Sequence, residues 1–244
     1  MSPYKLSINY LGDQFLIIEG PTQIDPDLTD YLRQFGEHLQ AHLQGLIFNI
    51  NLTYSSLCLQ YDEDKISYKF LRKKIIKHQN TFNFIKNNSL TLWNIPVCYH
   101  PDLATDLLDF CKHKNLPVEK LIELHTAPNY KIHFLGFLPG FPYLGGLNEQ
   151  LHHPRKKQPR SIVPAGAVGI GGEQTGIYPH ASPGGWQLIG QTPLTIFNPS
   201  HHPPALFKAG DYLRFSSITI DEYQTLKFKF ADTNYKHKPS TIPA

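Results

Sequence analysis

Residues that can contribute to a binding site are concentrated in one stretch of the chain, residues 125–193. Within it, Phe137, Phe141 and Tyr143 alternate with prolines and glycines. Proline fixes φ and glycine lets other groups approach the backbone, so such a segment can hold aromatic rings at a surface. Rings held in this way form a wall for a small planar or cyclic ligand. The same spacing also suits rings that fill a protein core, and the spacing alone does not separate the two.

Polar side chains in the same stretch are suited to binding a carboxylate, a phosphate or an amide. Arg155 and Arg160 each follow a proline, which lowers the conformational entropy that is lost when an arginine binds an anion. They equally fit the pattern of two solvent-facing arginines. Further amide, hydroxyl, phenol and indole groups occupy predicted turns and can form hydrogen bonds to an amide ring or a carboxylate. These groups belong to Gln174, Tyr178, Ser182 and Trp186.

Histidines are candidates for proton transfer or metal binding, because an imidazole titrates near neutral pH and is a common metal ligand. His125 ends a short predicted helix, where it can exchange protons with a substrate or interact with the C-terminal end of that helix. His38 and His42 are four residues apart on another predicted helix, but no third ligand is evident, so we predict no metal on this chain. The sequence contains no nucleophile elbow, zinc-protease motif or phosphate-binding loop.

Composition and charge limit the classes of partner. The 23 Lys and Arg residues against 20 Asp and Glu give a net charge of only +3, whereas a nucleic-acid partner would favour a concentrated basic patch. No stretch reaches the roughly 20 apolar residues of a membrane-spanning helix, and the N-terminus lacks the apolar core of a signal peptide. The three cysteines form no CxxC pair. We therefore expect a cytoplasmic protein without nucleic-acid or membrane partners.

The first part of the chain predicts a small scaffold domain, residues 1–85. Asp25 is a suitable N-cap and Pro26 suits the first position of a helix with one apolar stripe. The expected elements are strands 4–10 and 15–19, a helix that begins at 26 and ends before Gly45, strands 47–52 and 57–61, and a helix from 66. This order predicts a small α/β sandwich with its helices on one face of a mostly antiparallel sheet.

The second part of the chain predicts a β-rich domain, residues 90–232. The segment 136–190 holds 12 of the 17 glycines, a density that excludes long helices and favours short strands joined by tight turns, as in a small β-barrel. The expected helices are 102–113 and 117–124. The expected strands are 90–99, 131–134, 161–163, 168–171, 187–190, 194–197 and 212–215. Residues 233–244 are polar and end in proline, which predicts a flexible tail.

Several short motifs follow one another in a fixed order through this second part. They are Ile95-Pro-Val-Cys-Tyr99, His125-Thr126, Gly136-Phe-Leu-Pro-Gly-Phe-Pro-Tyr-Leu144, Pro154-Arg155, Pro159-Arg160, Val163-Pro-Ala-Gly166, Gln174-Thr-Gly-Ile-Tyr-Pro179, Ser182-Pro-Gly-Gly-Trp186 and Gly210-Asp211. In this order they resemble the family of 5-oxoprolinase B subunits, also described as allophanate hydrolase subunit 1 or as the sporulation kinase inhibitor type. The N-terminal half resembles the family more loosely.

The resemblance implies an α+β fold of two domains, a small ferredoxin-like α/β sandwich followed by a cyclophilin-like β-barrel. It implies a homologous C subunit and a larger A subunit as partners, in a complex that opens the lactam of 5-oxoproline to glutamate and consumes ATP. Because the chain has no phosphate-binding loop, ATP would contact other groups here or a partner protein of the complex. The alternatives are an inhibitor of a sensor histidine kinase and a component of a urea- or allophanate-metabolising amidohydrolase or of a biotin-dependent carboxyltransferase.

The resemblance also suggests roles for individual residues. Phe137, Phe141 and Tyr143 would line the pocket for the lactam ring, and His125 is the candidate for proton transfer. The residues expected to bind polar groups of the substrate are Arg155, Arg160, Gln174, Tyr178, Ser182 and Trp186. Two features depart from the family: the loop after Tyr99 is short, and Gln191 stands where an arginine is common.

Overall fold

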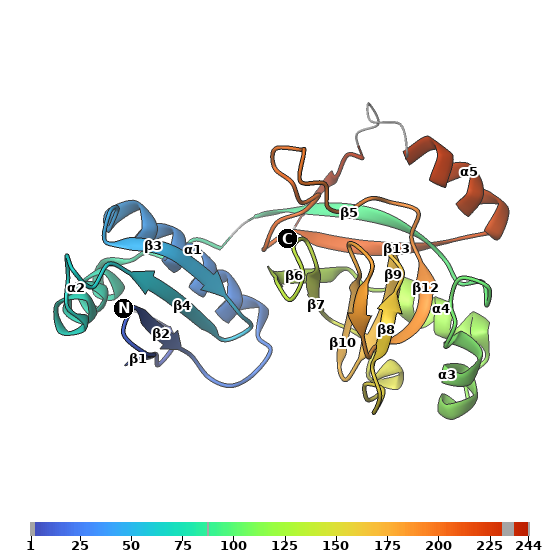
Figure 1. Cartoon of the computed structure of the whole chain (residues 1–244), viewed down its shortest axis with the longest axis horizontal. Coiled ribbons are helices and arrows are strands. Elements are labelled where there is room, and N and C mark those ends of the chain that lie inside the picture. Colours follow the sequence, from blue (N-terminus) through green and yellow to red (C-terminus); the bar gives the residue numbers. More distant parts are fainter. Residues whose placement is uncertain (1–2, 87, 231–236, 244) are drawn as a thin grey trace. The chain divides into compact units, whose positions relative to one another are not determined.

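The chain forms two compact units, residues 1–87 and 88–244. The computed structural model describes residues 3–86, 88–230 and 237–243 (Figure 1). The elements of the first unit are β1 (Ser7–Tyr10), β2 (Phe15–Glu19), α1 (Pro26–His42), β3 (Ile47–Leu52), β4 (Ser56–Tyr61) and α2 (Tyr68–Thr81). Those of the second are β5 (Ser89–Cys98), α3 (Leu107–Lys114), α4 (Val118–Thr126), β6 (Tyr130–Leu135), β7 (Pro142–Gly145), η1 (Glu149–Leu151), β8 (Arg160–Val163), β9 (Ala167–Gly171), β10 (Gln174–Ile177), β11 (Ser182–Gly184), β12 (Gln187–Gln191), β13 (Tyr212–Ile218), α5 (Ile220–Phe230) and β14 (Ser240–Pro243).

The first unit is an antiparallel sheet in the order β1-β2-β4-β3, with α1 packed against β3 and β4. The carboxylate of Asp25 accepts hydrogen bonds from the backbone N–H groups of Asp27 and Leu28, so α1 begins where the sequence predicts. Leu28, Leu32, Phe35 and Leu39 on α1 are fully buried, as their helical spacing predicts. The order of two strands, a helix, two strands and a helix is confirmed.

The second unit is built on a sheet that closes on itself. Its strand order is β12-β9-β10-β7-β6-β13-β5-β14, and β12 also pairs with β5 through Gln191 and Cys98. Seven strands therefore form a barrel, whose interior is filled by a continuous apolar core. Strand β5 pairs in parallel with β13, and the other pairings are antiparallel. Strands β8 and β11 form a separate two-stranded ribbon. The chain is thus an α+β protein of two units.

Several elements differ from the sequence prediction. Helix α3 begins at Leu107 rather than near residue 102, because the preceding residues form a turn in which Leu103 and Ala104 donate to the carbonyl of His100. The strand expected at 194–197 is only an isolated bridge between Phe197 and Ala205. It pairs with a segment that contains two prolines, and proline has no N–H to extend a ladder.

The C-terminal residues also differ from the expected flexible tail. Residues 240–243 form β14, which pairs with the first four residues of β5 as an edge strand. The rest of the predicted tail includes residues 233–236 and 244, which lie outside the described part of the chain. No helix among the described residues combines the length and apolar character needed to cross a membrane.

Candidate functional site

A second apolar layer lies on the outside of the barrel, over strands β7, β9, β10 and β12. Along β9, Val168 and Ile170 belong to the barrel interior, so the residues between and beside them face outward. The outer layer consists of Phe141, Val163, Ala167, Tyr178, Trp186 and Leu188, with Leu138 and Tyr143 packed against it. We call this set the aromatic layer. It brings together four of the aromatic residues that the sequence singled out.

Glycines make this layer possible because they leave the outer face of the barrel without side chains. A Cβ on Gly171 would lie 2.6 Å from the indole of Trp186, and a Cβ on Gly176 would lie 2.9 Å from the ring of Phe141. Both rings therefore rest directly on the backbone of the barrel, at a separation that only glycine allows. The glycine density of this segment reflects packing of rings against strands as well as turns.

This contact predicts the effect of a single added methyl group. Gly171→Ala should lower the free energy of unfolding by about 1–3 kcal/mol, because the indole cannot stay in place. The matched control is Gly185→Ala, where the nearest atom to an added Cβ is 3.6 Å away, an ordinary contact. Urea denaturation of both variants is the measurement. Equal destabilisation by the two changes would contradict the close packing of Trp186 on Gly171.

Phe141 is the centre of the aromatic layer. Its ring centroid lies 5.1 Å from Tyr143, 5.4 Å from Tyr178 and 5.3 Å from Trp186, in tilted or edge-to-face contacts. Phe141, Tyr178 and Trp186 are buried, and Tyr143 is half-buried. Phe137 packs edge-on against Phe141 at 5.8 Å, but its own side chain is 64% exposed. Phe137 and Tyr143 are therefore the rings that a ligand can reach.

The two predicted arginines have different environments. The guanidinium of Arg155 lies over the ring of Trp186, 5.7 Å from its centroid, and Arg155 is exposed. Within the described residues it forms no ion pair. Burial raises the pKa of Tyr143 and of Tyr178, and the charge of Arg155 opposes the rise at both phenols. Arg155 is thus a fixed cation at the edge of the aromatic layer that remains open to an anion.

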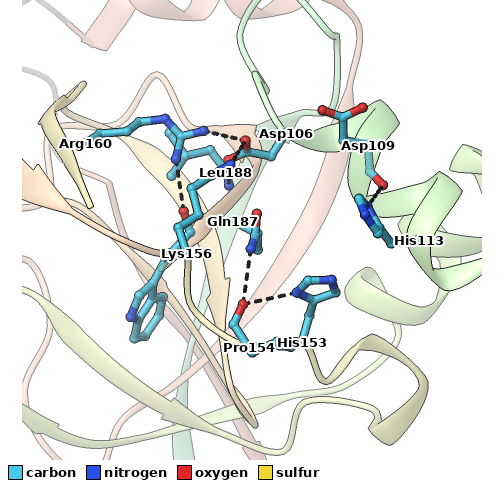
Figure 2. Close-up of polar contacts among 10 residues, drawn as sticks. Asp106, Asp109, His113, His153, Pro154, Lys156, Arg160, Gln187 and Leu188 are labelled. Atoms are coloured by element: carbon cyan, nitrogen blue, oxygen red, sulfur yellow. Dashed lines mark hydrogen bonds and ion pairs between the residues drawn. The ribbon is translucent and has the colours of Figure 1, made fainter. Parts of the chain in front are cut away.

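Arg160 is instead bound to an acid that the sequence analysis missed. Figure 2 shows Arg160 and Lys156 directed at Asp106, whose side chain is 5% exposed. The carboxylate accepts from the Arg160 guanidinium, from Lys156 Nζ at 2.9 Å and from the backbone N–H of Leu188 at 2.7 Å. Arg160 also donates to the carbonyl of Trp186. We call this network the Asp106 cluster, and it holds the segment that carries Trp186. Its members lie far apart in the sequence, so no local sequence pattern indicates it.

Two buried polar atoms near the aromatic layer have no hydrogen-bond partner within the described residues. Ser182 on β11 pairs with Val163 of β8 and is 8% exposed. Its hydroxyl has no hydrogen-bond partner within the described residues, and the same holds for the side-chain oxygen of Gln174 on β10. A buried hydroxyl without a partner costs about 1–3 kcal/mol, and a ligand could offset that cost only if the site opened to admit it.

His125 lies apart from the aromatic layer, in the interior. Its ring is fully buried, with Nδ1 2.7 Å from the hydroxyl of Tyr99 and Nε2 3.0 Å from the hydroxyl of Thr175. The ring stacks on Phe215 at 4.5 Å. Burial lowers the pKa of His125 to about 3, so the imidazole is neutral at pH 7. The predicted proton transfer would require this ring to become accessible. In the structure, the ring links α4 to β10 and to Tyr99, the residue that follows β5.

His38 and His42 of the first unit lie next to a third histidine, His78, which the sequence did not indicate. His78 of α2 places Nδ1 3.1 Å from Nε2 of His38, and the ring of His42 lies 4.0 Å from that of His38. Nevertheless, within the described part of the chain no group of three or more His, Cys, Asp or Glu residues is arranged to hold a metal ion.

Comparison with known proteins identifies the family. The family model of the carboxyltransferase domain, subdomain C and D, matches residues 6–207. The 5-oxoprolinase B subunit of Bacillus subtilis is 35% identical over 238 residues, which cover 91% of this chain and 97% of that protein. The chain belongs to the family of 5-oxoprolinase B subunits. The 5-oxoprolinase B subunit of Escherichia coli O157:H7 is 54% identical over 121 residues, which cover 50% of this chain and 56% of that one.

Solved structures share the fold of this chain. The crystal structure of TTHA0988 matches with a TM-score of 0.75 and 30% identity over 84% of the present chain, which corresponds to 40% of that longer chain. The Kluyveromyces lactis urea carboxylase matches with a TM-score of 0.80 over 99% of the present chain and 24% of its own. At 20% identity the latter likeness concerns the fold alone. The chain thus spans less than half of either solved chain.

Gln191, which the sequence analysis singled out, is held by the backbone of a neighbouring turn. Its Nε2 donates to the carbonyl of Ala165 at 2.8 Å. That bond supports the turn at Gly166, where an added Cβ would meet the carbonyl of Thr192 at 2.3 Å. Gln191 therefore acts here as a neutral support of the backbone rather than as a source of charge.

Proposed function

We propose that this chain is the B subunit of an ATP-dependent 5-oxoprolinase, which works together with a homologous C subunit and a larger A subunit. The complex opens the lactam of 5-oxo-L-proline with water to give L-glutamate, while ATP is hydrolysed to ADP and phosphate. Membership in the family of 5-oxoprolinase B subunits supports this function. The fold labels of a ferredoxin-like sandwich and a cyclophilin-like barrel, and a cytoplasmic location, belong to the same proposal.

The aromatic layer supplies groups that match this substrate. The lactam ring is small and largely apolar, and it would pack on the accessible rings of Phe137 and Tyr143. Its carboxylate would pair with Arg155, the cation that Trp186 holds in place. If the site opens around the substrate, the Gln174 oxygen would accept from the lactam N–H, and the Ser182 hydroxyl would donate to its carbonyl. Arg155 is the observation that carries the assignment.

The buried members of the predicted site have supporting roles in this proposal. Phe141 and Tyr178 keep the accessible rings in position, and Arg160 holds the backbone of Trp186 through the Asp106 cluster. His125 stabilises the barrel beneath the site. The chain offers no identified base to activate water, so we assign the attack on the carbonyl to the assembled complex. The purified chain alone should therefore be inactive.

The test is ATP-dependent release of glutamate by the chain co-expressed with its A and C homologues. Arg155→Gln should raise KM for 5-oxoproline by about 10- to 100-fold, because an ion pair to a carboxylate of roughly 1.5–3 kcal/mol is lost. The control is Lys157→Gln, an exposed cation in the same loop, which should leave KM within about twofold. Equal effects of the two variants, or lactam opening by the purified chain, would overturn the assignment.

A biotin-dependent carboxyltransferase component is the second candidate, because the matching family model is that of a carboxyltransferase domain and a putative urea carboxylase of Emericella nidulans is 24% identical over 244 residues. This function would require a biotinylated partner. Depletion with avidin should leave the activity of the co-expressed complex unchanged if the lactam-opening proposal is right. Loss of activity on depletion, or co-purification with a histidine kinase in place of the A and C homologues, would favour the alternatives.

A further inference from the structure

The basic residues of the first unit are strongly segregated along the chain. Residues 1–64 contain nine Asp or Glu and two Lys or Arg, whereas residues 65–86 contain seven Lys or Arg and no acid. Two of the seven are neutralised, because Lys65 pairs with Asp62 and Lys86 pairs with Asp27. The other five lie on α2 and form no ion pair within the described residues. They are Lys69, Arg72, Lys73, Lys74 and Lys77.

Three of these five cations line one hollow. The hollow has a volume of about 480 Å³ and lies between β1 and α2, two elements of the first unit. Its lining residues are Ile8, Asn9, Tyr68, Lys69, Arg72 and Lys73. None of them is acidic, and the volume is within the range of about 300–1,000 Å³ of small-molecule sites.

The walls of the hollow are joined to each other. The hydroxyl of Tyr68 donates to the carbonyl of Ile8 at 3.1 Å, which ties α2 to β1. The ring of Tyr10 lies 5.7 Å from that of Tyr68, edge to face. A ligand would therefore enter a hollow whose two sides are already positioned, which lowers the entropy lost on binding.

The spacing of the cations favours a compact ligand with several negative groups. Residues three and four apart on a helix lie on one face with Cβ atoms about 5–6 Å apart, so Lys69, Arg72 and Lys73 can reach one ligand together. Arginine offers a planar fork that matches the oxygens of a phosphate, and lysine adds point charges. The carboxylates of an acidic peptide would be spread out and would engage Lys74 and Lys77 as well.

We propose that this hollow binds an oligophosphate group, either of a nucleoside triphosphate or of an inorganic polyphosphate. The proposal goes beyond the lactam-opening function and does not rest on it, because none of its residues belongs to the aromatic layer or to the Asp106 cluster and its test measures binding alone. The chain would then have a phosphate site without a phosphate-binding loop motif in its sequence.

The experiment is calorimetric titration of the full chain with inorganic triphosphate at about 0.15 M salt, where exposed charges are screened over roughly 8 Å. Saturable binding is expected. Arg72→Gln combined with Lys73→Gln should weaken it by about tenfold or more. Lys74→Gln combined with Lys77→Gln removes the same charge from the same helix but outside the hollow, and should weaken it by about twofold or less. Circular dichroism melts of both variants check that the chain remains folded.

Two further titrations, with ATP and with an acidic peptide, distinguish a nucleotide from a bare phosphate chain and test whether a peptide binds instead. Tighter binding of ATP than of triphosphate identifies a nucleotide, and equal binding identifies the phosphate chain alone as the recognised group. Three results overturn the proposal: absence of saturable binding of triphosphate, equal weakening by the two double variants, or tighter binding of an acidic peptide than of triphosphate.

Discussion

Asp106→Asn should lower the free energy of unfolding by roughly 2–4 kcal/mol, the largest effect that we expect from a single conservative change. The substitution keeps the shape of the side chain and removes the charge that Arg160 and Lys156 share. It also weakens the acceptor of the Leu188 N–H. The estimate lies below the roughly 3–5 kcal/mol typical of fully buried pairs, because the arginine and lysine side chains keep 26% and 31% of their surface exposed.

The same substitution should affect the site. The Asp106 cluster fixes the chain on both sides of Trp186, since Lys156 also donates from its backbone to the carbonyl of Gly185 at 2.7 Å. When the carboxylate is neutralised, we expect Trp186 and the stacked Arg155 to lose their fixed position. In the co-expressed complex the change should appear as a higher KM for 5-oxoproline rather than as a lower kcat.

Urea denaturation of Asp106→Asn and Asp109→Asn is the decisive comparison. Asp109 is exposed on α3, the helix that begins directly after Asp106, so its neutralisation should change the free energy of unfolding by about 0.5 kcal/mol or less. A double-mutant cycle with Arg160→Gln should show a coupling energy of about 1 kcal/mol or more between Asp106 and Arg160. Equal losses in the two single variants, or additive losses in the cycle, would show that the cluster does not act as a unit.

Local patterns predicted the elements that depend on local chemistry. Helix α1 begins at Pro26 because Asp25 and the apolar stripe act within a few residues of each other. Helix α5 was missed although it has a local signal: Thr219 and Glu222 form a capping box, with Glu222 accepting from the backbone N–H of Thr219. Only Tyr223 is buried on α5, so this helix lacks an apolar stripe of the kind that made α1 predictable.

The candidate site could be predicted in composition but not in arrangement. The sequence indicated a segment rich in rings and cations, and the structure brings Phe141, Tyr143, Tyr178 and Trp186 together. It could not indicate that Arg160 would be neutralised, because its partner lies 54 residues earlier in the chain. Likewise, the burial of His125 depends on long-range strand pairing, since the barrel closes only where β12 pairs with β5. Long-range pairing is the part that local patterns do not encode.

The burial of His125 predicts a specific loss of stability in mild acid. In the folded chain its pKa is about 3, whereas an unfolded histidine has a value of 6.5. Between these values the unfolded chain binds the additional proton, so the free energy of unfolding falls as the pH is lowered from 7. Two-state linkage with these pKa values gives a loss of about 2 kcal/mol by pH 5. The loss continues toward pH 3, where the folded form itself begins to titrate.

His125→Gln isolates this contribution, because the amide cannot titrate but can still reach the hydroxyls of Tyr99 and Thr175. At pH 7 the variant should be less stable than the natural chain by about 1–3 kcal/mol, since the hydrogen bonds and the stacking on Phe215 are perturbed. Between pH 7 and pH 5 this difference should shrink by about 2 kcal/mol, because only the natural chain loses the histidine term. Carboxylates and the other histidines titrate in both proteins, so their contributions to the free energy of unfolding cancel in the comparison. A difference that stays constant over this range would mean that His125 binds protons equally in the folded and unfolded chain, and would return it to the group of accessible residues from which a proton-transfer role could be argued.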